Sequence, residues 1–137
     1  MRNGPMRRSL ISGVIAGLLV WASLAWPAAA GALELVMLER PGCAWCRRFD
    51  AEIAPAYPLT AEGARAPLRR VDVTGSWPGD LAGVRRERFT PTFVLVHEGV
   101  EVDRLRGYPG DEFFWFLLGE MLSRLPDPSP GGGVRKD

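Results

Sequence analysis

The sequence is poor in metal-binding side chains, because its 137 residues include only two cysteines and one histidine. A structural zinc site needs four ligands, so this set is too small for one. Covalent haem attachment needs a histidine directly after a Cys-x-x-Cys pair, and Arg47 occupies that position. A purely structural disulfide between Cys43 and Cys46 would close a very small loop and so stabilise the fold little. These absences favour reactive thiol chemistry for the cysteine pair.

The chain also lacks a strong excess of charge of one sign, with 17 basic and 16 acidic residues. Its paired arginines, at 47–48, 69–70 and 85–86, are scattered and have no aromatic residues interleaved with them. Nucleic-acid-binding proteins usually concentrate basic residues on one face. We therefore expect no nucleic-acid partner.

The first 30 residues have the pattern of a secretory signal peptide. Arginines form a basic start without an acidic residue, and an apolar run follows from 10 to 26. Small residues then fit a cleavage site near Ala30 or Ala32. The run is short for a membrane span of ~20 residues, although an uncleaved anchor is an alternative. We expect export to the periplasm, by the general or the twin-arginine route.

One domain is expected after this segment. Its removal takes away three of the 17 basic residues and no acidic one, which leaves 14 basic against 16 acidic residues, a net charge of −2. The domain is predicted at 31–125, a length sufficient for one hydrophobic core. Residues 126–137 are rich in proline and glycine and are expected to be disordered.

Strand and helix patterns alternate along this domain. Strands are predicted at 33–38, 69–73, 92–96 and 100–106, the last two joined by a turn at Glu98-Gly99. Helices are predicted at 47–54, opened by the preceding Cys-x-x-Cys segment, at 80–88 with Asp80 near the cap, and from a capping Asp111 to about Leu125. Residues 60–67 are expected to form a loop or a short, weak helix. The order β-α-β-α-β-β-α predicts an α/β domain with a four-stranded mixed sheet flanked by helices.

Two of the expected helices have an apolar face. Trp45, Phe49 and Ile53 recur every four residues and predict a buried stripe on the first helix. In the last helix one buried face fits Phe114, Leu117, Leu118, Met121 and Leu125. Phe113 and Trp115 fall outside that face and are candidates for a docking patch.

The two cysteines lie between the first predicted strand and the first predicted helix, in Pro41-Gly42-Cys43-Ala44-Trp45-Cys46. At a helix N-terminus the free N–H groups and the helix dipole stabilise a thiolate. Thiol pKa values there fall from ~8.5 into the range ~3.5–7.5. We expect Cys43 to be the exposed nucleophile and Cys46, one turn inside the helix, to resolve the mixed disulfide.

This arrangement resembles the thioredoxin-like superfamily over about residues 33–125. The Cys43–Cys46 segment matches its redox motif, and Gly107 matches the glycine before its last helix. Pro91, in Thr90-Pro91-Thr92-Phe93, matches the cis-proline that begins its third core strand. The resemblance implies a thioredoxin-like fold in which Pro91 lies against the cysteines and the backbone of Thr90 pairs with an extended substrate. Trp45 is the third expected substrate contact.

The sequence departs from thioredoxins at two places. Ala44-Trp45 separates the cysteines where thioredoxins have Gly-Pro. The buried acid that accepts the proton of the second cysteine in thioredoxins aligns with Met37. The resemblance therefore implies that another group, with Glu39 and water as the candidates, takes that proton.

A narrower set of segments, Pro41–Cys46, 49–58 and 88–95, resembles the periplasmic thioredoxin-like protein of bacterial thiosulfate-oxidation (Sox) systems. This resemblance implies a thiol–disulfide oxidoreductase that reduces a partner-protein disulfide and keeps a sulfur-carrier cysteine reactive. It also implies a membrane thiol-electron transporter as the reductant. We expect a monomer without a metal or a cofactor other than the Cys43–Cys46 disulfide.

Two other functions use the same cysteine pair. A thioredoxin-like Cu(I) carrier is one, because soft thiolates select that ion, although no methionine or histidine lies near the motif. A redox-inert adaptor with a permanent disulfide is the other. Reduction, oxidation and isomerisation all remain open directions for the dithiol chemistry itself.

Overall fold

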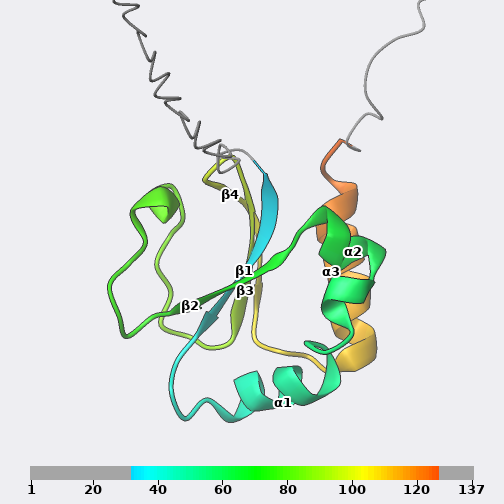
Figure 1. Ribbon diagram of the computed structural model, residues 1–137, viewed down its shortest axis with the longest axis horizontal. Helices are drawn as coiled ribbons and strands as arrows, with labels where there is room; N and C mark the ends of the chain where they lie inside the picture. Colours follow the sequence, from blue (N-terminus) through cyan, green and yellow to red (C-terminus); the bar gives the residue numbers. More distant parts are fainter. Residues whose placement is uncertain (1–31, 127–137) are drawn as a thin grey trace, which may run out of the picture.

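A four-stranded mixed sheet forms the centre of the computed structural model, which describes residues 32–126 (Figure 1). Its strands lie in the order β2-β1-β3-β4, and β1 pairs with β2 in parallel while the other neighbours are antiparallel. The strands are β1 (Leu33–Glu39), β2 (Leu68–Asp72), β3 (Thr92–His97) and β4 (Val100–Arg106). The predicted α/β fold class is confirmed. The predicted signal peptide (1–30) and all but the first residue of the predicted tail (126–137) lie outside the described residues.

The α-helices cover one face of the sheet, and a long irregular segment covers the other (Figure 1). The helices are α1 (Ala44–Glu52), α2 (Ala61–Arg65) and α3 (Asp111–Ser123), with the 3-10 turn η1 (Tyr57–Leu59) before α2. Helix α2 shows that residues 60–67, expected to form a loop or a short helix, contain a short helix. Within residues 32–126 we find no helix with the length and apolar character that a membrane crossing requires.

Strand β1 is buried on both faces, which explains its nearly continuous apolar sequence. Leu35 and Met37 face the helices, whereas Val36 and Leu38 face the irregular segment. On the helical side Phe49 of α1 is fully buried at the centre of an aromatic cluster. Its ring centroid lies 4.8, 5.7 and 5.2 Å from those of Phe93, Tyr108 and Phe114. This cluster joins α1 to β3 and α3.

The buried stripe of α1 is shorter than the sequence pattern predicts. Phe49 and Ile53 are fully buried, but Trp45 is 53% exposed. Trp45 lies in the first turn of the helix, and the Arg48 guanidinium, not the core cluster, lies against its ring.

The helix expected at 80–88 does not form. Only the 3-10 turn η2 (Gly79–Leu81) is helical there, and the Asp80 carboxylate binds Arg69 instead of capping a helix. Gly83 forms an isolated bridge to Val100, and a Cβ atom at this glycine would lie 2.7 Å from a hairpin carbonyl oxygen. Contacts with the hairpin thus take up backbone groups that a helix would use internally.

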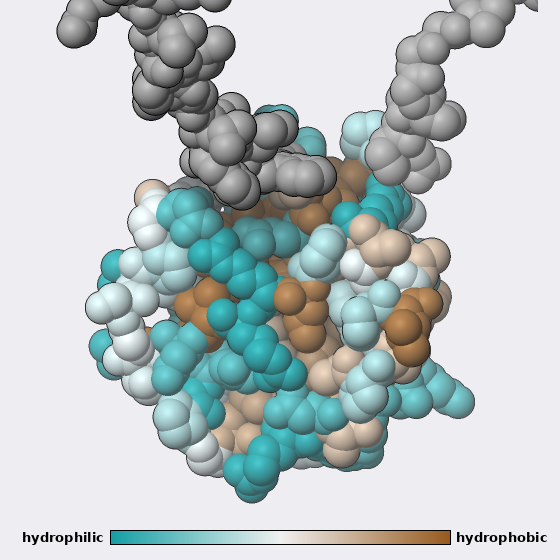
Figure 2. Space-filling view, viewed as in Figure 1, coloured by the Kyte–Doolittle hydropathy of each residue, from teal (hydrophilic) through white to brown (hydrophobic). Residues whose placement is uncertain are grey.

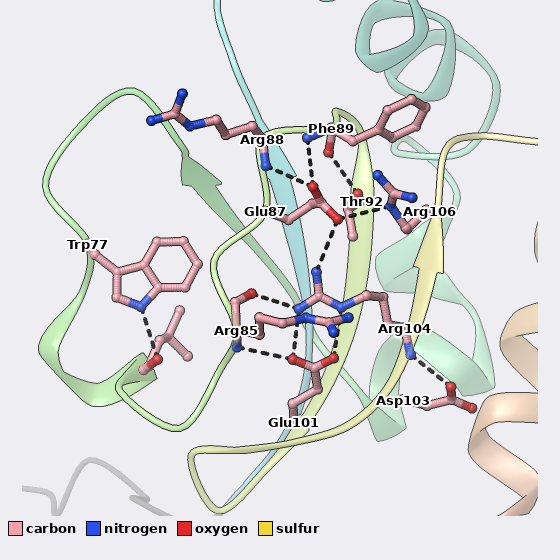
Figure 3. A network of polar contacts seen from close by, with 11 residues as sticks. Trp77, Arg85, Glu87, Arg88, Phe89, Thr92, Glu101, Asp103, Arg104 and Arg106 are labelled. Atoms are coloured by element: carbon pink, nitrogen blue, oxygen red, sulfur yellow. Dashed lines mark hydrogen bonds and ion pairs between the residues drawn. The ribbon is translucent and has the colours of Figure 1, made fainter.

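A buried arginine anchors the end of this segment to β4 (Figure 3). The side chain of Arg104 is 7% exposed and donates hydrogen bonds of 2.7 Å to both carboxylate oxygens of Glu101 and to the carbonyl of Arg85. Glu87 lies 3.7 Å from Arg104 and accepts hydrogen bonds from the backbone N–H groups of Arg88 and Phe89. The network therefore fixes the chain just before Thr90–Pro91.

Helix α3 begins one residue earlier than a cap at Asp111 would place it. Gly110, with φ of 102°, occupies the cap position, and Asp111 is the first helical residue. The acidic first turn, which also contains Glu112, complements the positive end of the helix dipole. The C-terminal boundary, Ser123, is two residues before the expected one.

The apolar side chains of α3 divide differently from the prediction. The buried face consists of Phe114, Leu118, Met121 and Leu122, while Leu117 and Leu125 are half-buried. Trp115 is also half-buried and stacks on Tyr57, with ring centroids 5.9 Å apart. Phe113 and Phe116 are the exposed pair, at 65% and 64%. In Figure 2 the exposed apolar side chains (brown) form separate patches between hydrophilic ones (teal).

We expect Phe49→Ala to lower the free energy of unfolding by about 3–5 kcal/mol, because it opens a cavity between α1, β3 and α3. Urea unfolding of the oxidised protein measures this loss. Leu59→Ala is the matched control, since Leu59 is 86% exposed and its truncation should change stability by no more than ~0.5 kcal/mol. Equal effects of the two substitutions would contradict the placement of the core.

The Arg104 network predicts how stability depends on pH. The hydrogen bond from Arg104 is the main cause that lowers the pKa of Glu101. A lowered folded-state pKa gives stability that is present above the unfolded value of ~4.3 and is lost as the pH falls through the folded value. Glu101→Gln should therefore be less stable than the wild type near pH 7, with the difference shrinking below about pH 4.

Thermal unfolding across this pH range measures the effect. Glu120→Gln is the control, because Glu120 is exposed on α3 and forms no ion pair with any residue of the described segment. A stability difference for Glu101→Gln that stays constant with pH would show that Arg104 does not hold this carboxylate in its charged form.

Candidate active site

A tight turn connects the end of β1 to α1. The backbone N–H of Cys43 donates to the carbonyl of Arg40 over 3.3 Å, which closes a four-residue turn. Pro41 and Gly42 are its central residues, and Gly42 has φ of +76°. Proline followed by a residue with positive φ is the signature of a type II turn. A side chain at position 42 would be strained for this reason and not through a clash, because the space around it is open.

The cysteine pair forms a disulfide at the first turn of α1. The S–S distance is 2.09 Å. Cys43 is the cap residue of the helix, and its Sγ accepts a hydrogen bond of 3.1 Å from the backbone N–H of Cys46. The helix begins at Ala44, so the Cys-x-x-Cys segment opens it as expected, and its first turn contains no acidic side chain. The end of the helix dipole therefore acts on the Cys43 sulfur without an opposing charge in that turn.

Both cysteines are largely buried in the disulfide form. Cys43 is 8% exposed and Cys46 is 4% exposed. The two exposed fractions differ little, although Cys43 was expected to be the exposed cysteine of the pair. They border a surface depression of about 310 Å³. Its lining consists of Glu39, Arg40, Pro41, Gly42, Cys43, Cys46, Arg47, Asp50 and Asp72. Solvent thus reaches the sulfur atoms from this side.

The Thr90–Pro91 peptide bond is cis, as the resemblance implies. Pro91 is buried, and its carbonyl accepts a hydrogen bond of 2.8 Å from the N–H of Gly107. The hydroxyl of Thr92 donates to the carbonyl of Phe89 over 2.7 Å. These bonds and the Arg104 network hold the loop from both sides. The substrate-binding roles of Trp45, Thr90 and Pro91 stay predictions.

Two exposed aromatic side chains each have an arginine over the ring. The Arg48 guanidinium lies 5.5 Å from the Trp45 ring centre, and that of Arg106 lies 4.9 Å from the ring centre of Phe89. Phe89 is 51% exposed and directly precedes Thr90–Pro91. It is a candidate contact residue that the sequence analysis missed, although its position beside the proline motif was a usable signal.

A series of hydrogen bonds connects Arg48, the arginine that lies over the Trp45 ring, to Glu52 and Tyr108. Glu52 accepts hydrogen bonds from Arg48 over 2.8 Å and from the Tyr108 hydroxyl over 2.6 Å. These two bonds lower the pKa of Glu52. Burial, followed by the bond to Glu52, raises the pKa of the Tyr108 hydroxyl, which therefore stays protonated and donates.

The position that aligns with the buried acid of thioredoxins is Met37. Its side chain is fully buried and, being a methionine, has no titratable group. The alternative acceptor Glu39 is present beside the cysteines, and it accepts a 2.7 Å hydrogen bond from Arg70. Arg70 also pairs with Asp50. The sequence analysis missed both Arg70 and Asp50. The four-residue spacing from Cys46 to Asp50, which places both on one side of a helix, was the available signal.

The described part of the chain contains no group of three or more His, Cys, Asp or Glu side chains arranged to hold a metal ion. The single histidine, His97, is exposed at the end of β3.

Among known proteins, the matches to this chain are solved structures. No protein-family model matches the chain, and no curated protein matches it. Among solved structures, the periplasmic thioredoxin SoxS from Paracoccus pantotrophus in its reduced form is 50% identical, with a TM-score of 0.64. The match covers 67% of this chain and 97% of that chain.

Two more distant thioredoxins share the fold. Poplar thioredoxin h is 23% identical with a TM-score of 0.50, and the match covers 69% of this chain and 80% of that chain. A mutant thioredoxin from Halobacterium salinarum is 20% identical with a TM-score of 0.51, and the match covers 70% of this chain and 80% of that one. The Cys-x-x-Cys disulfide at the start of α1 and the extensive identity to a thioredoxin lead to one conclusion. The chain belongs to the thioredoxin family and is a thiol–disulfide oxidoreductase.

Proposed function

We propose that this protein works in the periplasm as a reductant of partner-protein disulfides, with Cys43 as the nucleophile and Cys46 as the resolving thiol. The observation that supports this most directly is the position of the Cys43 sulfur. It is the cap of α1 and accepts the backbone N–H of Cys46. In the reduced protein the same N–H stabilises negative charge on that sulfur, which is the form that attacks a disulfide.

The reaction has two exchange steps. The Cys43 thiolate attacks one sulfur of the partner disulfide, a mixed disulfide forms, and the other partner sulfur leaves as a thiolate. The Cys46 sulfur then attacks Cys43 and releases the second partner thiol. The partner gains two electrons and two protons, and the protein is left with the Cys43–Cys46 disulfide, the state in the structure.

The similarity to the periplasmic thioredoxin SoxS supports the compartment. The client that we propose follows from the sequence resemblance to the thioredoxin-like protein of Sox systems: a sulfur-carrier protein of a thiosulfate-oxidation system, whose cysteine must be returned to its thiol form. The signal-peptide pattern in the first 30 residues agrees with export.

The proposal requires an electron donor, because each turnover oxidises Cys43 and Cys46. A membrane thiol-electron transporter would supply the two electrons through a second disulfide exchange at the same sulfur atoms. The chain itself works as a monomer with the disulfide as its redox group, and needs no metal ion for this chemistry.

Cys46→Ser should trap clients as mixed disulfides on Cys43, because the first attack proceeds and the second cannot. Trapping in a periplasmic extract, followed by non-reducing electrophoresis and mass spectrometry, identifies them. We expect the sulfur-carrier protein among the adducts. Cys43→Ser is the matched control and should trap little. The reverse pattern would exchange the two roles, and adducts that lack a sulfur carrier would overturn the proposed client.

Trp45→Ala should weaken recognition of a protein client more than it slows reduction of a small disulfide. Trp45 is exposed one residue before Cys46, so a protein client can cover it, whereas a small reagent needs only the sulfur. We expect KM for the client to rise by about tenfold, the equivalent of ~1.4 kcal/mol. Leu59→Ala is the control for an exposed apolar side chain outside the redox motif. An equal loss with both substrates would contradict a recognition role.

A further inference from the structure

The second exchange step needs a group that accepts the proton of Cys46. The Cys46 side chain must lose its S–H proton to attack Cys43, yet the residue is 4% exposed. Met37, at the position of the buried acid of thioredoxins, cannot accept a proton. This chain must therefore place its acceptor elsewhere.

Strand register places three charged side chains on the face of the sheet that α1 covers. Met37 lies in the core cluster that contains Cys46, so its side of β1 faces the helix. Glu39 is two residues further along β1 and lies on the same face. In the parallel pairing Arg70 is the partner of Met37, and Asp72 is the partner of Glu39.

Helix α1 brings a further carboxylate to this place. Asp50 follows Cys46 by four residues, so the two side chains are neighbours on one side of the helix. Arg70 joins the layers, because one guanidinium nitrogen donates to Glu39 over 2.7 Å and another donates to Asp50. A single cation thus holds a carboxylate from β1 and a carboxylate from α1 at fixed positions.

Cys46 and both carboxylates border the same depression. Its volume of about 310 Å³ is enough for several water molecules, since one occupies ~30 Å³ in the liquid. The other charged groups on its border are Arg40, Arg47 and Asp72. Asp72 accepts hydrogen bonds from the hydroxyl and the backbone N–H of Thr74 and takes no part in the ion pairs of Arg70 with Glu39 and Asp50.

We propose that Glu39 and Asp50, held by Arg70, form the proton-accepting pair for the Cys46 thiol. As the Cys46 sulfur attacks Cys43, its proton passes through water in the depression to one of the two carboxylates. The bond between Cys43 and the partner sulfur breaks, and the partner leaves as a thiolate that takes a proton from solvent. Arg70 acts as a positioning residue. This inference rests on Cys46 being the resolving thiol, as proposed above.

The reaction of the reduced protein, in excess, with 5,5′-dithiobis(2-nitrobenzoate) separates the two steps. The first thionitrobenzoate is released by attack of Cys43, and the second by attack of Cys46 on the mixed disulfide. In Glu39→Gln/Asp50→Asn we expect the second phase to slow by about tenfold or more near pH 7. The difference should vanish above about pH 9.5, where a thiol ionises without an acceptor. The first phase should change little.

Asp72→Asn is the matched control, because it removes one negative charge from the same depression and leaves the Arg70 pair intact. It should keep the second phase within about twofold of the wild type. An unchanged second phase in the double variant would overturn the inference. So would a slowing that is the same at every pH, or an equal slowing by Asp72→Asn. The assay uses no client protein, so its outcome is independent of the client proposed above.

Discussion

The hydrogen bond from the backbone N–H of Cys46 to the Cys43 sulfur is the interaction on which the redox site depends. It exists because the Pro41-Gly42 turn delivers Cys43 to the cap of α1, where backbone N–H groups have no partner within the helix. In most helices a serine, threonine or aspartate oxygen occupies this position. Here a sulfur atom does, so the same local geometry that starts the helix also favours the reactive thiolate.

The two faces of the sheet contribute different parts of the site. On the face covered by α1, the Phe49 cluster fixes the helix, and with it Cys46 and Asp50, against β1 and β3. On the other face the segment 73–91 has no α-helix and is instead held by side-chain bonds to β4. Arg104 ties the end of that segment just before Thr90–Pro91. The helix that carries the sulfur pair and the loop that carries the proline are therefore held by different sets of contacts.

The arginine chemistry around the site follows one physical pattern. Arg104 is nearly buried and is balanced by Glu101 and Glu87, as a desolvated cation requires. Arg70 is about one-third exposed and holds the carboxylates of Glu39 and Asp50 in place. The first arrangement fixes a loop, and the second places charge beside a reacting thiol.

Short-range patterns predicted much of this architecture. The four strands, the Glu98-Gly99 turn and the Cys43–Cys46 pair at a helix start were all accessible, because each depends on residues close in sequence. The prediction of a helix at 80–88 was wrong because the stability of that helix would have come from local bonds. Instead, Leu81 and Val84 pack in the core on the sheet, and Gly83 forms a backbone bridge to Val100 in the hairpin. Trp115 was expected to be exposed, but Tyr57, 58 residues earlier, stacks on it.

The sequence by itself determined the chemistry of this protein, because a dithiol at a helix start needs only a turn, a cap and two residues between the sulfur atoms. The tertiary structure alone decided which groups surround that dithiol. Arg70 reaches Glu39 and Asp50 through strand pairing and helix packing, and these bring together residues that are 31 and 20 positions apart. No local sequence pattern predicts these contacts of Arg70, since they depend on how the helix layer packs on the sheet.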